Sequence, residues 1–394
     1  MPAPGPLVFL SAGEPSGDLL GARLMQALKN KTKNRIHFAG VGGPSMEEQG
    51  LQSLFPMSDL TVMGVFEVLP RLSRILRRLR ETVTAAKHLA PDAVVTIDSP
   101  DFNFRVAKRL KGKGIPLVHY VAPSVWAWRP HRAARIARFL DHLLTLLPFE
   151  PPYFQTEGLP ATFVGHPVLD GGADTGDGNA FRQRHGIAAK DTVIVVLPGS
   201  RLGEISRLAD VFRETLILLK KKFPGLHIVV PSIASVADTV LRNTADWPPP
   251  VIVVEGDTEK FDAFAAANVA LAASGTVALE LALAKTPAVI AYKFAPLSWF
   301  FIRRLVKVRF VHLVNLILDR EEIPEFLQGA CRPDVMATTI KGLLADRGRR
   351  AKQIAAYNTA LKQLRPDGGS PAEKAAEVVL NILHEAKQKP STTE

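Results

Sequence analysis

The sequence predicts an α/β protein built from two doubly wound domains. Short apolar runs alternate with helical patterns over residues 1–170, and the same alternation begins again after residue 180. This alternation is typical of parallel sheets that helices cover on both faces. Between the two halves, residues 170–179 read DGGADTGDGN, lack apolar periodicity and indicate a linker. A chain of 394 residues is also long enough for two domains that each bury a core.

The expected strands are apolar throughout, as in strands that are buried on both faces. They are residues 7–10, 93–97, 117–120 and 143–147 in the first half, and 193–197, 227–230, 251–254, 269–272 and 288–291 in the second. Helices are expected between them. From about residue 333 the pattern is helical, with a turn at RPDGGSP (365–371) before a last helix.

These elements predict a first domain over residues 1–170, a linker over 171–180 and a second domain over 181–345, with a cleft between the two domains. Residues 346–394 are expected to form helices that pack on the first domain or are exchanged between two subunits. The chain would then be a monomer or a C-terminally exchanged homodimer.

Composition and charge indicate the compartment in which the protein works and the kind of partner that it binds. The single cysteine, Cys331, cannot form an internal disulfide, and the first residues lack the basic start of a secretory signal, so we expect a cytoplasmic protein. The formal charge is +11, which raises the question of an anionic partner. We find no zinc-finger spacing, no aromatic RNA-binding signature and no basic tail, so we expect no nucleic-acid partner.

The positive charge is concentrated in two apolar segments. Residues 71–80, RLSRILRRLR, carry five arginines on an amphipathic helical pattern, and residues 299–310, WFFIRRLVKVRF, interleave four cations with aromatic and branched residues. Such segments are typical of proteins that bind an anionic membrane surface, and their charges exclude a membrane-spanning helix. Alternatively, the arginines are solvated and the apolar residues beside them belong to an ordinary core. The expected membrane and acyl-chain contacts are Val62, Met63, Phe66, Leu69, Arg74, Arg77, Arg78, Trp299, Phe300, Arg303 and Arg304.

Loops that follow strands are the candidate sites, because ligands of open parallel sheets bind at the carboxyl ends of the strands. Residues 11–18, SAGEPSGD, resemble a phosphate loop but lack the spacing of dinucleotide-binding and Walker motifs, so we do not place the nucleotide there. Residues 197–201, LPGSR, follow a strand and open a helix, which predicts an anion site that includes Arg201. A generic turn is the alternative.

Residues 273–284, ASGTVALELALA, predict the rest of a nucleotide site. Ser274 is the expected N-cap, and Gly275 lets a phosphate approach the backbone. Thr276 and Glu280 share one helix face, where the carboxylate could accept ribose hydroxyls. A plain capped helix with a surface glutamate is the alternative.

Residues 97–103, IDSPDFN, supply a candidate general base. Asp98 stands at the end of a strand, Pro100 stiffens the turn, and Asp101 is expected to cap the next helix, a role that Asn103 could also take. The two carboxylates lack the D-x-D spacing that many sugar-nucleotide enzymes use for a divalent cation, so we expect no metal. In APSVWAWRPHR, Trp126 and Trp128 are two residues apart; one is expected to pack and the other to meet the cleft, unless both are core residues.

Taken in order, the motifs resemble the lipid A disaccharide synthase family, whose members are glycosyltransferases of the GT-B type with two Rossmann-like domains. The motifs are SAGEPSGD, GVGGPSM, VMGVFEVL, DSPDFNF, APSVWAWRPHR, FVGHPVLD, LPGSRLGEI and ASGTVALE. The resemblance implies inverting transfer of 2,3-diacylglucosamine from its UDP derivative to 2,3-diacylglucosamine 1-phosphate, with release of UDP. It implies that the enzyme needs no cofactor. It also implies that the enzyme acts at the inner face of the inner membrane.

The resemblance also implies roles for single residues. Asp98 would be the base that takes the proton of the acceptor 6-hydroxyl, and Arg201 would neutralise the diphosphate. Val314 stands where a proline is expected. The remaining positions expected at the UDP-sugar are Ser16, Gly17, Gly199, Ser200, Ser274, Gly275, Thr276, Glu280, Asn315 and Glu322.

Alternatives remain on the same fold and outside it. On the same fold they are an N-acetylglucosaminyltransferase that acts on a peptidoglycan precursor and a UDP-N-acetylglucosamine 2-epimerase. A non-enzymatic binding protein is the alternative of another class.

Overall fold

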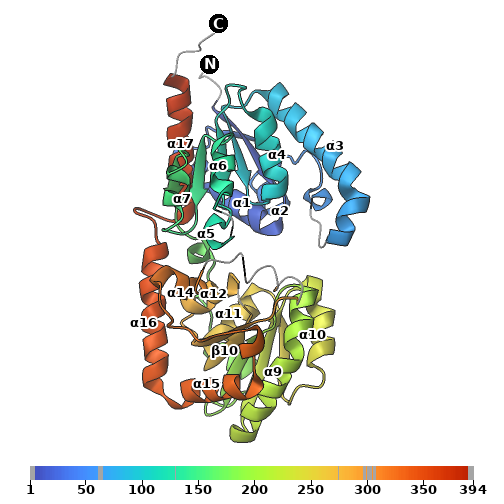
Figure 1. Cartoon of the computed structure of the whole chain (residues 1–394), viewed down its shortest axis with the longest axis vertical. Helices are drawn as coiled ribbons and strands as arrows, with labels where there is room; N and C mark the ends of the chain where they lie inside the picture. Colours follow the sequence, from blue (N-terminus) through green and yellow to red (C-terminus); the bar gives the residue numbers. More distant parts are fainter. Residues whose placement is uncertain are drawn as a thin grey trace. The chain divides into compact units, whose positions relative to one another are not determined.

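The chain folds into two compact α/β units, each with its own parallel sheet (Figure 1). The computed structural model describes residues 5–60, 65–128, 130–273, 275–295, 299, 304 and 308–388. Unit 1 consists of residues 1–167 and 364–394, and unit 2 consists of residues 168–363. The predicted fold class is confirmed.

The sheet of unit 1 has the strand order β2-β1-β3-β4-β5-β6, and all its paired strands are parallel. Its strands are β1 (Leu7–Ala12), β2 (His37–Val41), β3 (Ala93–Ile97), β4 (Leu117–Tyr120), β5 (His142–Thr145) and β6 (Ala161–Phe163). Its helices are α1 (Pro15–Thr32), α2 (Pro44–Glu48), α3 (Val65–Leu89), α4 (Pro100–Leu110), α5 (Val125–Trp128), α6 (Arg132–Ala137), α7 (Pro151–Gln155) and α17 (Pro371–Gln388).

The sheet of unit 2 has the order β12-β11-β10-β7-β8-β9 and is also parallel. Its strands are β7 (Thr192–Leu197), β8 (Leu226–Ser232), β9 (Val251–Glu255), β10 (Val269–Ala272), β11 (Ala288–Tyr292) and β12 (Glu325–Leu327). Its helices are α8 (Gly178–Arg184), α9 (Leu202–Lys222), α10 (Ala237–Thr244), α11 (Asp257–Ala266), α12 (Val277–Leu283), α14 (Leu313–Leu318), α15 (Pro333–Ala345) and α16 (Arg347–Leu364).

Helices cover both faces of the sheet in unit 1. On one face, α1 and α17 pack their apolar sides against alternate residues of the central strands. On the other face, α3, α4 and α6 cover the intervening residues. In unit 2, α9, α10 and α15 bury one face of the sheet. The central strands are apolar throughout because helices lie on both of their sides.

Three strands were not predicted: β2, β6 and β12. Each lies at an edge of its sheet and is only partly buried. The exposed faces of these three strands need fewer apolar residues, so they lack the continuous run that marks a central strand. The fourth edge strand, β9, keeps such a run and was predicted.

The C-terminal helices differ from the expectation for residues 346–394. Helix α16 belongs to unit 2, where Gln353 exchanges hydrogen bonds with the backbone of Ala288 at the start of β11. Only α17, red in Figure 1, packs in unit 1, where Ala375, Val379 and Leu383 join the core beside α1. In the described ranges, none of the helices has both the length and the apolar character that a membrane crossing requires.

Candidate functional site

A cavity of about 280 Å³ lies at the carboxyl edge of the sheet in unit 2. It is formed where the loops after β7, β8 and β10 meet the first turns of α9 and α12. Five residues that the sequence predicts for the UDP-sugar line it: Gly199, Ser200, Gly275, Thr276 and Glu280. Residues that the prediction missed also line it, and two of these are charged, Glu204 and Lys260.

The loop from β7 to α9 is held by Glu204. One carboxylate oxygen accepts a hydrogen bond from the Ser200 backbone N–H at 3.2 Å, and the other accepts from Arg201 Nη1 at 3.2 Å. Gly199 has φ +125°, and a Cβ there would lie 2.6 Å from Glu204 Cβ, so the loop passes directly over this side chain. Arg201 is the N-cap residue of α9 and its side chain is 79% exposed; it is not one of the cavity-lining residues.

Glu204 is itself buried, with 7% of the residue exposed. The Tyr292 hydroxyl, at the end of β11, donates to it at 3.0 Å. Burial, and then the Glu204 carboxylate, raise the pKa of Tyr292. Glu204 stands three residues after the N-cap and accepts a hydrogen bond from a backbone amide that precedes the helix. Glutamates at this position commonly stabilise the start of a helix, so the spacing in LPGSRLGE could have identified Glu204 from the sequence.

The second loop of the cavity leads from β10 to α12. Ser274 lies outside the described residues. Gly275 has φ +150°, and a Cβ there would meet open space. Helix α12 begins at Val277 with Thr276 at the N-cap, so the prediction of Ser274 as N-cap is wrong. The reason is the backbone of Gly275, which is far from helical and delays the helix by two residues.

Glu280 stands on the first turns of α12 and pairs with a lysine from another helix. Both of its carboxylate oxygens lie 3.2 Å from Lys260 Nζ on α11. Lys260 also pairs with Asp257 at 2.9 Å. The described residues contain no group of three or more His, Cys, Asp or Glu side chains that could hold a metal ion.

In unit 1, Asp98 follows β3 directly and is partly exposed. Its backbone has φ +51° and that of Ser99 has φ +42°, a left-handed turn that lifts the side chain out of the strand direction. Ser16 Oγ donates to Asp98 Oδ2 at 3.1 Å. A Cβ on Gly17 would lie 3.5 Å from Asp98 Cβ, so the structure brings Ser16 and Gly17 together with Asp98.

Asn103 fixes this turn. Its amide nitrogen donates to the backbone oxygens of Ser11, Ile97 and Asp98 at 2.8 to 3.1 Å, and its oxygen accepts from Ser11 Oγ at 2.7 Å. Asp101 is exposed in the first turn of α4, and the N-cap residue of this helix is Ser99. The expected cap is therefore corrected: Asn103 holds the ends of β1 and β3 instead.

Two further candidate bases stand near this edge, Glu14 and His119. Glu14 is exposed at the N-cap of α1 and makes no side-chain cap bond. His119 is fully buried, 2.8 Å from Thr96 Oγ1 and 4.6 Å from the Phe104 ring, and burial lowers its pKa to about 3. Its surroundings are those of a core histidine.

Trp126 of the WAW motif is half-buried and contacts Phe149 and Glu150. Its Nε1 donates to Glu150 at 3.1 Å, and its ring lies edge-on to Phe149 at 5.2 Å. Burial raises the pKa of Glu150 to about 7, although hydrogen bonds from Trp126 and from two backbone amides oppose the shift. Trp128 is half-buried.

Asn315 and Glu322 do not line the cavity. Asn315 is buried; its oxygen accepts from the backbone N–H of Glu322 and Ile323, each at 2.9 Å. Glu322 pairs with Arg320 and Lys352. Both residues brace their own segment of unit 2, beside the fully buried Val314.

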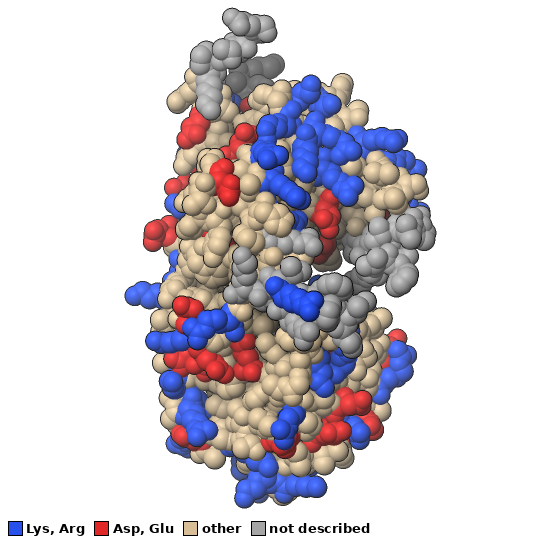
Figure 2. Space-filling model, in the orientation of Figure 1, with Lys and Arg blue, Asp and Glu red and all other residues tan. Residues whose placement is uncertain are grey.

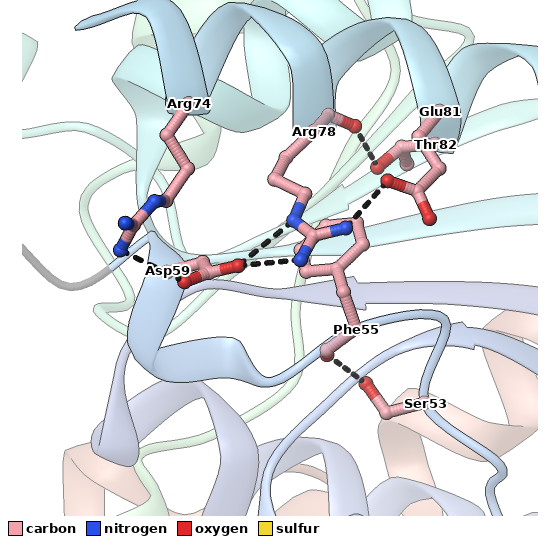
Figure 3. A network of polar contacts seen from close by, with 7 residues as sticks. All are labelled: Ser53, Phe55, Asp59, Arg74, Arg78, Glu81 and Thr82. Carbon is pink, nitrogen blue, oxygen red and sulfur yellow. Dashed lines mark hydrogen bonds and ion pairs between the residues drawn. The ribbon is translucent and has the colours of Figure 1, made fainter. Parts of the chain in front are cut away.

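One of the expected membrane cations is structural. Figure 3 shows Arg78 between the carboxylates of Asp59 and Glu81, each 2.7 Å from it, with its guanidinium 4.6 Å from the centre of the Phe55 ring. Only 18% of its side chain is exposed, so the expectation that Arg78 meets a membrane is corrected. Arg74 reaches the same Asp59 at 3.4 Å but is 54% exposed.

The other expected membrane contacts are described only in part. Arg77 and Arg304 are exposed, and Trp299 stacks on Phe294 at 5.8 Å. Figure 2 shows Lys and Arg gathered over α4 on the surface of unit 1, where Arg105, Lys108 and Arg109 are exposed. Outside the description lie Val62, Met63, Phe300, Arg303 and the side chains of Phe66 and Leu69.

Comparisons with known proteins agree with the sequence motifs. The family model described as lipid-A-disaccharide synthetase matches residues 8–379. The lipid-A-disaccharide synthase of Rhodospirillum centenum is 55% identical and covers 96% of this chain and 94% of its own. That of Paramagnetospirillum magneticum is 50% identical over 97% of this chain and 99% of its own.

Two solved structures share the fold at low identity. A UDP-GlcNAc 2-epimerase from Neisseria meningitidis bound to UDP-GlcNAc aligns with a TM-score of 0.62 at 11% identity, over 96% of this chain and 99% of its own. Acinetobacter baumannii MurG aligns with a TM-score of 0.55 at 15% identity, over 97% of this chain and 100% of its own.

Proposed function

Since the chain belongs to the lipid-A-disaccharide synthase family, we propose that unit 2 binds the UDP part of the donor and that Asp98 of unit 1 activates the acceptor. The chain is an inverting glycosyltransferase that joins UDP-2,3-diacylglucosamine to 2,3-diacylglucosamine 1-phosphate. The products are the β-1′,6-linked disaccharide 1-phosphate and UDP. The epimerase and MurG share the fold with this chain, whereas relatives at 55% and 50% identity bear the synthase name.

The observation that carries the proposal is the convergence of the LPGSR and ASGT loops on one cavity. A helix N-terminus offers free backbone N–H groups and a positive dipole end to phosphates. The open space beside Gly275 leaves room for a phosphate against the backbone. We assign Gly199, Ser200 and Thr276 to the diphosphate side of the UDP.

Arg201 and Glu280 complete the donor site in this proposal. Arg201 is exposed enough to turn to the diphosphate, where negative charge grows as the bond to the anomeric carbon breaks. The Glu280 carboxylate accepts the ribose hydroxyl hydrogens. Because their side chains bond within unit 2, Asn315 and Glu322 support the site from outside the cavity.

The chemical step needs one proton acceptor. The acceptor 6-oxygen attacks the anomeric carbon from the face opposite UDP, the carbon–phosphate-oxygen bond breaks, and UDP leaves with the electron pair. The proton of the 6-hydroxyl passes to the Asp98 carboxylate, while Ser16 holds Oδ2 in place. Attack from the opposite face inverts the anomeric carbon and gives the β linkage.

We also propose that the protein docks on the anionic inner face of the inner membrane from the cytoplasm, where both acylated substrates reside. Arg77 on α3, the exposed cations of α4 and Arg304 supply positive charge, and each such residue near an anionic surface contributes about 1 kcal/mol. Helix α17 packs on unit 1, an arrangement that a monomer and a homodimer with exchanged α17 would share.

The direct test is incubation of the purified protein with the acylated UDP-sugar and the 1-phosphate acceptor, followed by mass spectrometry of the lipid product and assay of released UDP. Unacylated sugars run in parallel test the lipid requirement. Formation of a disaccharide only with the intact protein and both substrates is the expected result. Release of UDP without disaccharide would refute the proposed transfer.

A further inference from the structure

Lys260 is the only lysine or arginine among the described residues that line the cavity of unit 2. It comes from α11, outside both loops that the motifs mark. Its Nζ lies 3.2 Å from each carboxylate oxygen of Glu280, and the two side chains are 21% and 23% exposed. Asp257 and the ring of Phe261 hold the ammonium from other sides, at 2.9 Å and 4.6 Å.

This contact fixes the direction of the Glu280 carboxylate. A glutamate side chain has several rotamers, and a cation that contacts both oxygens selects one of them. A carboxylate has about four lone-pair sites, so the ammonium leaves sites free for two hydroxyl groups. A 1,2-diol can therefore bind Glu280 while Lys260 stays in place.

The charges in the cavity wall also indicate that Lys260 acts on Glu280. Glu204 is a second carboxylate in the cavity wall, but Arg201 pairs with it, whereas the described partner of Glu280 is Lys260. Without Lys260 the Glu280 carboxylate would be unpaired and would repel an anionic nucleotide. Lys260 offsets this charge at the point where a neutral sugar hydroxyl has to approach a carboxylate.

We propose that Lys260 is a positioning residue that holds Glu280 for the two ribose hydroxyls, and thereby sets a preference for ribonucleoside over 2′-deoxyribonucleoside diphosphates. The inference rests on the proposed role of Glu280 in the donor site. It assigns to Lys260 an effect on sugar discrimination, which a direct contact of the ammonium with phosphate would not produce.

The test is calorimetric titration of UDP and 2′-deoxy-UDP into five proteins. Four of these are the wild type, Glu280→Gln, Lys260→Met and Lys221→Met, and the fifth is Lys260→Arg. Lys221 is exposed near the C-terminal end of α9, far along the helix from the cavity, so its variant controls for the loss of one positive charge. Lys260→Arg is a second variant at the position that keeps the charge.

We expect the wild type to prefer UDP by about tenfold or more, the effect of one hydrogen bond to a charged group. Glu280→Gln should lose most of this preference. Lys260→Met should reduce the ratio of the two affinities by up to about fivefold, as for a partly exposed ion pair. Lys221→Met should leave the ratio unchanged, and Lys260→Arg should keep it within about twofold.

Two results would overturn the inference. Equal weakening of both nucleotides by Lys260→Met would show a phosphate contact or a general structural role, while leaving the Glu280 assignment intact. A wild type that does not discriminate, with Glu280→Gln unchanged, would refute the ribose role of Glu280 and remove the basis of the inference. Thermal unfolding of each variant establishes that it is folded.

Discussion

Replacing Asp98 by asparagine should remove transfer while leaving the fold and UDP binding intact. Asparagine keeps an acceptor oxygen for the 3.1 Å hydrogen bond from Ser16. It also tolerates the left-handed φ of +51° at this position at least as well as aspartate. We therefore expect the free energy of unfolding to change by less than about 0.5 kcal/mol.

The amide cannot accept the proton of the 6-hydroxyl, so turnover should fall about 100- to 10,000-fold. This corresponds to about 2.7 to 5.5 kcal/mol in the activation free energy. The assay is disaccharide formed per folded molecule, with calorimetric UDP affinity measured on the same sample. Retention of more than about a tenth of the turnover would refute Asp98 as the base, and exposed Glu14 would be the next candidate.

Asp101→Asn is the matched control. Asp101 is exposed in the first turn of α4, where its negative charge interacts with the positive end of the helix dipole and stabilises the helix by about 0.3 to 1 kcal/mol. This variant should lose that small amount of stability and keep its turnover.

Three further predictions address the nucleotide site, the basic surface and a buried acid. Arg201→Ala should weaken UDP binding about 10- to 150-fold in calorimetry, the effect of a charge-assisted hydrogen bond; unchanged affinity would move the diphosphate away from LPGSR. Arg77→Ser should reduce co-sedimentation with anionic vesicles about fivefold without loss of stability, whereas Arg78→Ser should lower the free energy of unfolding, because it removes the ion pairs with Asp59 and Glu81. Equal effects of the two changes on both measurements would contradict the division between them. Burial raises the pKa of Glu150 to about 7, so the folded protein holds a proton that the unfolded chain releases near pH 4.5. The contribution of Glu150 to stability therefore falls by roughly 3 kcal/mol as the pH rises from about 4.5 to 7. In denaturant titrations, Glu150→Gln should gain stability relative to the wild type over this range, and a pH-independent difference between the two proteins would show that the carboxyl is ionised throughout.

The central strands of both sheets could be predicted because burial on two faces requires a continuous apolar run. The edge strands β2, β6 and β12 could not, since their exposed faces allow polar residues. The place of α16 in unit 2 was also beyond the sequence. It depends on Gln353 meeting the backbone of Ala288, a contact between residues that are 65 positions apart.

The basic segment over residues 71–80 shows that the sequence also could not predict the role of single side chains. Sequence periodicity placed Arg74, Arg77 and Arg78 on one basic helix and could not distinguish them. The structure separates them, because Asp59 lies beside α3 and binds Arg78 closely while Arg77 remains exposed. Only a contact from outside the helix reveals which cation is free to meet a ligand.

Among the polar residues of the motif loops, hydrogen-bonding capacity separates those that hold the loops from those that can meet a substrate. Asn103 uses both its amide groups on the ends of β1 and β3, and Asp18 accepts three backbone N–H bonds from residues 43–46. Within the described residues, the Asp98 carboxylate accepts one hydrogen bond and stays partly exposed, so it retains lone pairs for a proton. The partners of Asn103 and Asp18 lie up to 92 and 28 positions away. Three conspicuous polar residues in neighbouring motifs therefore look alike in sequence, and the folded chain leaves Asp98 with the capacity to act as a base.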